Sequence, residues 1–402
     1  MRSQAQTETI DLTALLAPVR PKDFFSEHWE RKPLYLSRGD THYYHSVLTN
    51  EDLEEIISSS DMRYPAIQLA RNGSYLAPEA YTRNIKHGSE FFNGVPDLGQ
   101  IQSEYRSGAT VVLPALQRTW PPLRQLCVAL EDEFSHPVHA NAYLTPGGSP
   151  GFTPHYDAHE VFVLQIAGTK RWRVFEPPLP LPHRTQSFSP TGYSLPAPTL
   201  ELELRPGDLL YLPRGFVHAA NTLHGHSAHV TVGITVYTWV ELIAELANAA
   251  KEMPTLREAL PPGFTTREEL KETLRHSLFQ CFDLLRANVD AERLIDGFLQ
   301  RVRSARVRPQ QAFNSDARVI GLQTRFKAPD VGSYHVSIEP RGVVMEFAGK
   351  KFVLPEKIRV TIDEMCRRQS FCLEDISGPL DSEGKLTLAR YLHGERFLTL
   401  VD

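Results

Sequence analysis

A histidine and an aspartate two residues apart stand at the start of an apolar run, in the segment FTPHYDAHEVFVLQIAGTKRWRVF (152–175). Side chains at positions i and i+2 of a β-strand project from one face, so a strand here directs His155 and Asp157 together and Tyr156 away from them. An imidazole and a carboxylate that converge suit a divalent first-row metal, and a second histidine would complete the triad of non-haem Fe(II) sites. The HxD tripeptide alone is weak evidence, because it occurs by chance in many proteins.

Two neighbours of this motif, His159 and Glu160, compete for the proximal ligand site, and a third ligand must come from elsewhere. Glu160 has the opposite strand parity to Asp157 unless a bulge intervenes, so Asp157 is the better choice over Glu160 and His159. The segment RPGDLLYLPRGFVHAA (205–220) indicates a turn, a strand and a second turn that brings His218 back to the same site. Three further histidines lie in or near the polar loop that follows, and we interpret them as solvated or supporting side chains: His224, His226 and His229.

A lysine occurs in the strand expected after the turn at 167–169. Lys170 shares one face of that strand with Trp172 and Val174, which indicates that it points inward, where an unpaired ammonium is costly. It must therefore meet an anion or reach solvent at the strand end. The anion is either a carboxylate of the protein or, more specifically, a bound dicarboxylate with one end on the metal and the other on Lys170.

The composition indicates a globular protein of two or three domains. The chain has 402 residues, 41% of them hydrophobic, and a formal net charge of −5, which does not favour a general nucleic-acid or membrane-surface binder. No stretch approaches the ~18 apolar residues of a membrane span, and the first residues carry no apolar core of a secretory signal. The four cysteines form no CxxC pair, which is typical of reduced thiols. We expect a cytoplasmic protein.

The positioning elements change character along the chain. The first 130 residues indicate mixed short elements, and residues from about 140 to 237 contain short β-branched or aromatic runs separated by Gly and Pro, which predicts an antiparallel sandwich or barrel. The proline- and serine-rich segment 177–198 is a long loop, either a lid or irregular. Residues from about 240 to 303 have helical apolar spacing, and the last hundred indicate strands followed by helices.

These motifs together closely resemble one family. PHYDAHEVFVLQIAGTKRWRVF, PGDLLYLPRGFVHAANT and AHVTVGI resemble the JmjC-type ribosomal oxygenases, which are cupin-fold, Fe(II)- and 2-oxoglutarate-dependent protein hydroxylases of bacteria and the eukaryotic nucleolus. FFSEHWERKPLYLSRGD near the N-terminus resembles the family's entry motif. The resemblance implies an α+β chain with a double-stranded β-helix (jelly-roll) domain at 1–239 that includes a mixed N-terminal extension. It further implies a helical dimerisation region at 240–305 and a winged-helix-like module at 306–402.

The resemblance also implies site residues, co-substrates and partners. It assigns three iron ligands, His155, Asp157 and His218. It assigns four residues to the 2-oxoglutarate pocket, of which the first would bind the distal carboxylate: Lys170, Asn141, Tyr143 and Thr231. Molecular oxygen is the other co-substrate. Some bacterial members use arginine at the lysine position, so Lys170 favours the subset that resembles the eukaryotic histidyl hydroxylases.

The implied activity is hydroxylation of a His or Arg side chain in a ribosomal protein, by a homodimer. This chain reads HYDAH where some members read HxDD, so the resemblance does not specify the target. The alternatives are hydroxylation of another peptide such as a natural-product precursor, lysine demethylation, or a non-catalytic cupin that binds a ligand or partner. The sequence pI of about 6.4, and a C-terminal segment DEMCRRQSFCLED with only two adjacent arginines, disfavour direct nucleic-acid binding.

Overall fold

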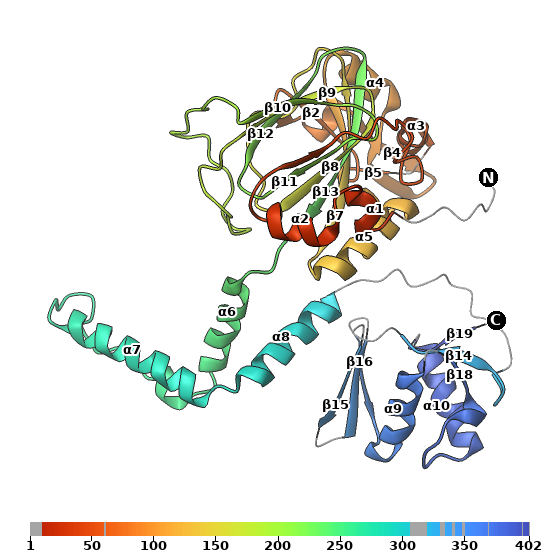
Figure 1. Cartoon of the computed structure of the whole chain (residues 1–402), viewed down its shortest axis with the longest axis vertical. Coiled ribbons are helices and arrows are strands. Elements are labelled where there is room, and N and C mark those ends of the chain that lie inside the picture. Colours follow the sequence, from red (N-terminus) through yellow and green to blue (C-terminus); the bar gives the residue numbers. More distant parts are fainter. Residues whose placement is uncertain are drawn as a thin grey trace. The chain divides into compact units, whose positions relative to one another are not determined.

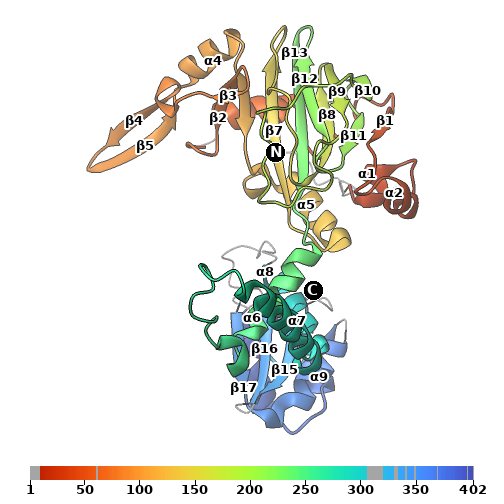
Figure 2. The same ribbon diagram turned by 90° about the vertical axis from the view of Figure 1, so that its left-hand side faces the viewer.

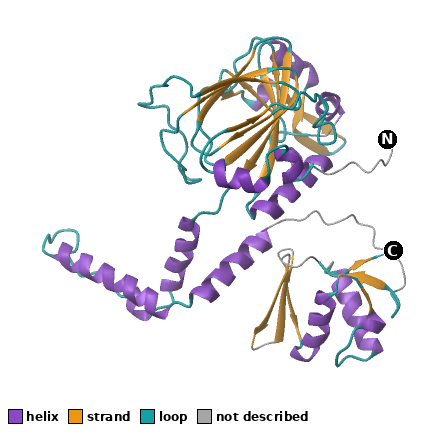
Figure 3. Ribbon diagram, viewed as in Figure 1, coloured by secondary structure: helices purple, strands orange, loops and turns teal. Residues whose placement is uncertain are grey.

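The computed structural model describes residues 10–59, 62–305, 320–329, 334–339, 342–347, 350–368, 370–395 and 397–401. The chain forms two compact units, Met1–Thr238 and Trp239–Asp402. Both units combine helices and antiparallel strands (Figures 1 and 3). The expected boundary between residues 305 and 306 borders the segment 306–319, which lies outside the described residues. Within the described residues no helix is long and apolar enough to cross a membrane.

Two antiparallel sheets form the body of the first unit, as the short β-branched and aromatic runs predicted. The larger sheet has the order β1-β11-β8-β13-β7-β6-β2-β3, and the smaller has the order β10-β9-β12. The strands of the larger sheet are β1 (Leu34–Leu36), β2 (Gln68–Arg71), β3 (Ser74–Tyr75), β6 (Thr110–Leu113), β7 (Val138–Pro146), β8 (Glu160–Ala167), β11 (Leu209–Leu212) and β13 (His226–Ile234). Those of the smaller sheet are β9 (Lys170–Phe175), β10 (Leu200–Leu204) and β12 (Val217–Thr222).

Strand β8 shows why the two sheets pack together. Its residues are buried on both faces as far as Ile166, and residues 161–164 (VFVL) accordingly form an uninterrupted apolar run instead of an alternating pattern. Val161 and Val163 pack with Trp172 and Val174 of the smaller sheet, so one face of β8 looks into the space between the sheets. Sheets that pack face to face in this way form the cupin-type double-stranded β-helix.

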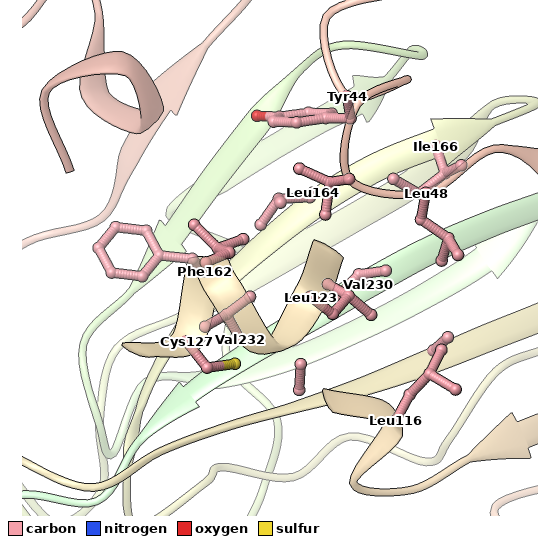
Figure 4. Close-up of a cluster of buried hydrophobic side chains, with 14 of the residues drawn as sticks. Tyr44, Leu48, Leu116, Leu123, Cys127, Phe162, Leu164, Ile166, Val230 and Val232 are labelled. Atoms are coloured by element: carbon pink, nitrogen blue, oxygen red, sulfur yellow. The ribbon is translucent and has the colours of Figure 1, made fainter. Parts of the chain in front are cut away.

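The other face of β8 packs under helices. Phe162, Leu164 and Ile166 join the main core with residues of α1 (Leu12–Leu16), α2 (Pro21–Glu27) and α5 (Pro121–Phe134). Figure 4 shows Phe162 and Leu164 in this core beside Leu123 and Cys127 of α5. These helices leave the opposite face of the sheet for the candidate site.

Several further short elements of the first unit lie between α2 and α5 in the sequence. They are α3 (Asn50–Ser59), α4 (Leu98–Arg106), the ribbon of β4 (Thr82–His87) with β5 (Glu90–Pro96), and the 3₁₀ turns η1 (Pro78–Ala80) and η2 (Leu116–Arg118). Figure 2 shows the β4–β5 ribbon extending from the body of this unit. Its two strands pair only with each other.

The second unit begins with three helices and continues as a small mixed module. The helices are α6 (Trp239–Ala250), α7 (Leu270–Asn288) and α8 (Ala291–Ala305), with η3 (Pro254–Arg257) between the first two. The module has a β15-β16-β17 sheet, a β18-β14-β19 sheet and two helices around one core. Its elements are β14 (Arg325–Lys327), β15 (Tyr334–Glu339), β16 (Gly342–Phe347), β17 (Lys350–Leu354), η4 (Glu356–Ile358), α9 (Arg359–Arg367), β18 (Phe371–Cys372), η5 (Leu373–Asp375), α10 (Ser382–Gly394) and β19 (Thr399–Leu400).

Candidate metal centre and co-substrate pocket

Three side chains predicted as metal ligands converge in the first unit. One ligand atom from each of His155, Asp157 and His218 lies within 4.8 Å of the others. Asp157 Oδ2 is 3.6 Å from His218 Nε2, and the two imidazole centroids are 4.6 Å apart. Across the described ranges no second group of three such side chains is close enough to hold a metal.

The local backbone differs from the sequence expectation. Strand β8 begins at Glu160, so the HxD motif lies in the irregular segment before it, and the prediction of a strand at 155–157 is wrong. An isolated antiparallel bridge joins His155 to His218 instead. In addition, the amide of Gly215 donates to the carbonyl of Asp157 at 3.0 Å. Because opposed residues of an antiparallel bridge project to the same side, the bridge brings both imidazoles to one point.

Both imidazoles have the tautomer that a metal ligand needs. His155 Nδ1 lies 2.7 Å from the carbonyl of Thr153, and His218 Nδ1 lies 3.1 Å from that of Phe216. A carbonyl oxygen only accepts, so each Nδ1 carries the hydrogen, and in the neutral ring Nε2 is then the nitrogen whose lone pair can bind a metal. Burial, reinforced by His155, lowers the pKa of His218 to about 4, so this ring is neutral at neutral pH.

The carboxylates near the motif have separate roles. Burial raises the pKa of Asp157, but the nearby imidazoles, chiefly those of His159 and His218, together lower it by more. The net shift of the pKa is downward and favours the ionised carboxylate as a ligand. Glu160 is fully buried and accepts hydrogen bonds from Tyr211 and Arg214. The choice of Asp157 over Glu160 is therefore consistent with where the two side chains point.

The four other predicted site residues line the same cavity as the triad. This cavity has a volume of about 200 Å³, and its walls include Asn141, Tyr143, Lys170 and Thr231. Asn141 and Tyr143 share one face of β7, and the register places Thr231 of β13 directly opposite Asn141. The structure therefore brings together all seven residues that the sequence predicted.

Lys170 is buried without an acidic partner. Its side chain is 3% exposed, and its Nζ donates to Thr145 Oγ1 at 3.1 Å and lies 3.4 Å from His229 Nδ1. Among the residues that the structure describes, no carboxylate pairs with this ammonium, which removes the protein-internal ion pair as its explanation. Burial lowers the pKa of Lys170 to about 7, so a bound anion would stabilise the charged form.

Sequence reasoning missed two polar partners of Lys170. His229 belongs to β13, where it is buried, stacks on Tyr143 at 4.8 Å and meets Trp172 edge-on at 5.6 Å. Thr145 is also buried, two positions beyond Tyr143 on the same face of β7. The period-two pattern of Asn141, Tyr143 and Thr145 is the signal that could have found it. His224 and His226 are exposed, as expected of solvated side chains.

A cupin-type barrel with a His–Asp–His cluster in its cavity is the arrangement of a JmjC domain, and residues 116–242 match the family model described as "JmjC domain". The chain is 34% identical over 244 residues to Ribosomal oxygenase 1 of Gallus gallus, a match that covers 60% of this chain and 39% of that protein. It is 30% identical over 342 residues to Ribosomal oxygenase 2 of Rattus norvegicus, covering 82% of this chain and 67% of that one. The chain belongs to the JmjC-type ribosomal oxygenase family.

Solved structures show the same fold. The ribosomal oxygenase YcfD of Escherichia coli aligns with a TM-score of 0.52 at 17% identity, over 95% of this chain and 98% of that chain. A structure of YcfD in complex with cobalt and 2-oxoglutarate aligns with a TM-score of 0.51 at 17% identity, over 96% and 99% of the two chains. The matched region spans only about two fifths of the Gallus gallus protein.

Proposed function

We propose that this chain is an Fe(II)- and 2-oxoglutarate-dependent oxygenase that hydroxylates a histidine or arginine side chain of a ribosomal protein. The observation that carries the proposal is one cavity that contains both a two-histidine, one-carboxylate cluster and a buried ammonium without an acidic partner. The cluster fits the metal, and the ammonium fits the far end of a keto diacid.

The chain's residues would divide the binding work between two ends of the co-substrate. His155, Asp157 and His218 would hold the metal by two Nε2 atoms and one carboxylate, a donor set that leaves positions open for other ligands. Lys170 would bind the distal carboxylate, with Thr145 and His229 holding its ammonium in place. Iron with 2-oxoglutarate and O2 would supply the oxidation, in which one oxygen atom of O2 enters succinate, formed with CO2, and the other enters the substrate C–H bond.

The walls of the cavity would orient the co-substrate and limit water. Asn141, Tyr143 and Thr231 contribute amide and hydroxyl groups to the cavity that the metal ligands and Lys170 also line. His229 stacks on Tyr143 and meets Trp172 edge-on, and these ring contacts hold the three side chains in place. Preorganised groups of this kind contribute by position, since they need no rearrangement when the reaction occurs.

The substrate class rests on relatives and on one residue. The relatives include proteins named Ribosomal oxygenase 1 and 2, and a protein of Aedes aegypti named as a bifunctional lysine-specific demethylase and histidyl-hydroxylase. Lys170 supports membership of the subset that resembles the histidyl hydroxylases. The competing functions are hydroxylation of another peptide such as a natural-product precursor, demethylation of lysine, and ligand binding without catalysis.

The second unit would serve assembly and docking, and the protein would act in the cytoplasm. Helices α6 and α7 bury none of their residues, and they expose large apolar side chains, among them Trp239 at 79% and Phe279 at 57%. Such faces are typical of a surface that a second copy covers, which supports a homodimer. The module from β14 to β19 would be winged-helix-like, with a structural or peptide-docking role and no direct nucleic-acid binding.

Two experiments test the proposal, one on the reaction and one on the protein that is hydroxylated. Anaerobic Fe(II) titration followed by exposure to O2 and 2-oxoglutarate should yield succinate with the natural chain and none with His155→Ala. Mass spectrometry of host ribosomal proteins, with and without this gene, should show a mass increase of one oxygen atom on one peptide. Succinate formation without such a peptide would favour another target, and equal succinate from both proteins would reject the oxygenase.

A further inference from the structure

The proline- and serine-rich loop at 176–199, between β9 and β10, has no part in the function proposed above. Two aromatic side chains anchor it to the body of the first unit. Phe188 meets Tyr156 edge-on with ring centroids 5.2 Å apart, and Tyr193 meets Phe188 edge-on at 5.6 Å. The Tyr156 hydroxyl also donates to the carbonyl of Gln186 at 3.3 Å.

The anchor point lies directly behind the metal ligands. Phe188 and Tyr193 pack on a small core formed by Tyr156, Phe175 and Val217, which are 8%, 1% and 0% exposed. Tyr156 stands between His155 and Asp157 in the sequence, and Val217 immediately precedes His218. The loop therefore covers the immediate chain neighbours of all three ligands, on the side of the backbone away from the cavity.

The position of Tyr156 matters because the HxD segment is not part of a strand. The segment precedes β8, and the backbone bonds that hold it are those to His218 and Gly215. These bonds fix the backbone of the segment, whereas the packing of Tyr156 against Phe188 fixes its outward face. Groups that orient ligands from behind typically change metal affinity about 10- to 100-fold when they are lost.

We propose that the loop at 176–199 is a positioning element of the metal centre: Phe188 packs on Tyr156 and thereby holds His155 and Asp157 in the arrangement that binds the metal. The proposal rests on the assignment of the triad as the metal site. Because coupling between two sites is reciprocal, metal binding must in turn stabilise the packed form of the loop. Protection of Arg184, an exposed residue of this loop, reports that effect.

The experiment uses the full chain with Co²⁺ as the probe and measures two quantities, the Co²⁺ dissociation constant and the rate of tryptic cleavage after Arg184. Phe188→Ala should weaken Co²⁺ binding about tenfold, and Phe188→Leu, which keeps apolar volume, should recover part of the loss. Tyr156→Phe keeps the ring and should bind Co²⁺ nearly as the natural chain does. Phe91→Ala, which removes an aromatic ring 71% exposed on β5, is the matched control and should change neither quantity.

Co²⁺ should slow cleavage after Arg184 in the natural chain and in Phe91→Ala, and slow it much less in Phe188→Ala. Natural Co²⁺ affinity in Phe188→Ala, or cleavage after Arg184 that ignores Co²⁺ in the natural chain, overturns the proposal. His155→Ala distinguishes a failure of the metal-site assignment from a failure of the proposed role of the loop. If His155→Ala binds Co²⁺ as tightly as the natural chain, the metal site itself is wrong, whereas a loss confined to His155→Ala rejects the role of the loop alone. Should Phe188→Ala not fold, Phe188→Leu and Tyr193→Ala carry the same comparison.

Discussion

The backbones of His155 and His218 exchange two hydrogen bonds, one of 2.8 Å donated by His218 and one of 3.2 Å donated by His155. This bridge places two imidazoles side by side without extending β8 through the HxD motif. Since the backbone makes the bridge, either imidazole can be removed while the connection that brings the segments together remains. Variants of the ligands therefore test chemistry more than folding.

The first prediction concerns His155. Its replacement by alanine removes one of three ligands, so the affinity for Co²⁺ should fall by more than the 10- to 100-fold typical of losing an outer partner, that is by more than about 100-fold. Succinate formation should be lost with it. The control is His224→Ala, which removes an exposed imidazole from the loop after β12. Isothermal titration would contradict the ligand assignment if both variants bound Co²⁺ equally.

The second prediction separates Lys170 from the metal. Lys170→Met keeps the length of the apolar stem and removes the charge that would meet the distal carboxylate. A charge-assisted hydrogen bond contributes about 1.5–3 kcal/mol, so the KM for 2-oxoglutarate should rise about 10- to 100-fold. Co²⁺ affinity measured without 2-oxoglutarate should stay unchanged, because Nζ contacts Thr145 and His229 and none of the ligands. If Lys170→Met weakened Co²⁺ binding as much as it raised the KM for 2-oxoglutarate, the assignment of Lys170 to the distal carboxylate would be wrong.

The third prediction follows from the titration of Lys170 in the ligand-free protein. Burial lowers its pKa from 10.5 to about 7. Between these pH values the unfolded chain holds a proton that the folded chain does not, so the free energy of unfolding should increase as pH rises from about 7 towards 10. Lys170→Met lacks this proton, and its unfolding free energy relative to the natural chain should decline across the same interval. Parallel pH profiles for the two proteins in urea unfolding would refute the shift.

The sequence predicted which side chains converge in the cavity, but it did not predict the backbone that brings them together. His155 and Asp157 were paired by strand parity, yet an isolated bridge to His218 and the outward packing of Tyr156 produce the same convergence. Periodicity describes a chain that continues in one conformation, and it does not show where a strand gives way to an irregular segment held by tertiary contacts.

Burial explains the remaining differences. His229 was grouped with the polar loop because Ser, Gly and His surround it, but nine-residue pairing of β13 with β7 carries the strand through this stretch. The partner of Glu160, Arg214, was also missed, because the sequence holds no local signal that two residues so far apart form a buried ion pair. An antiparallel sandwich or barrel was predictable from the short β-branched and aromatic runs, whereas the cupin type was implied by the family resemblance.

The fourth prediction concerns that ion pair. Arg214 is 5% exposed, and its guanidinium bonds to Glu30 and, at 3.1 Å, to Glu160. Arg214→Met would leave two carboxylates without their cation, and breaking a buried pair in this way costs about 3–5 kcal/mol. Arg171→Met removes an arginine whose pair with Glu203 is 40% exposed on each side, and an exposed pair contributes only about 0–1 kcal/mol. The free energy of unfolding, measured in urea by tryptophan fluorescence, should therefore decrease more in Arg214→Met than in Arg171→Met. Similar decreases in the two variants would contradict the stabilising role of the buried ion pairs.

The fifth prediction concerns assembly through the helices of the second unit. On helix α7, the side chains of Leu278, Phe279 and Phe282 are 54%, 57% and 54% exposed. Exposing such an apolar cluster to water is unfavourable, and a second copy of the chain would cover it. Phe279→Glu would place a charge in that contact and should shift the molar mass in solution from that of two chains to that of one. Gln280→Glu adds the same charge at the neighbouring exposed position, which points in another direction around the helix, and should leave the dimer intact. Light scattering during size-exclusion chromatography distinguishes these outcomes, and a natural chain that elutes as a monomer at micromolar concentration would reject the homodimer.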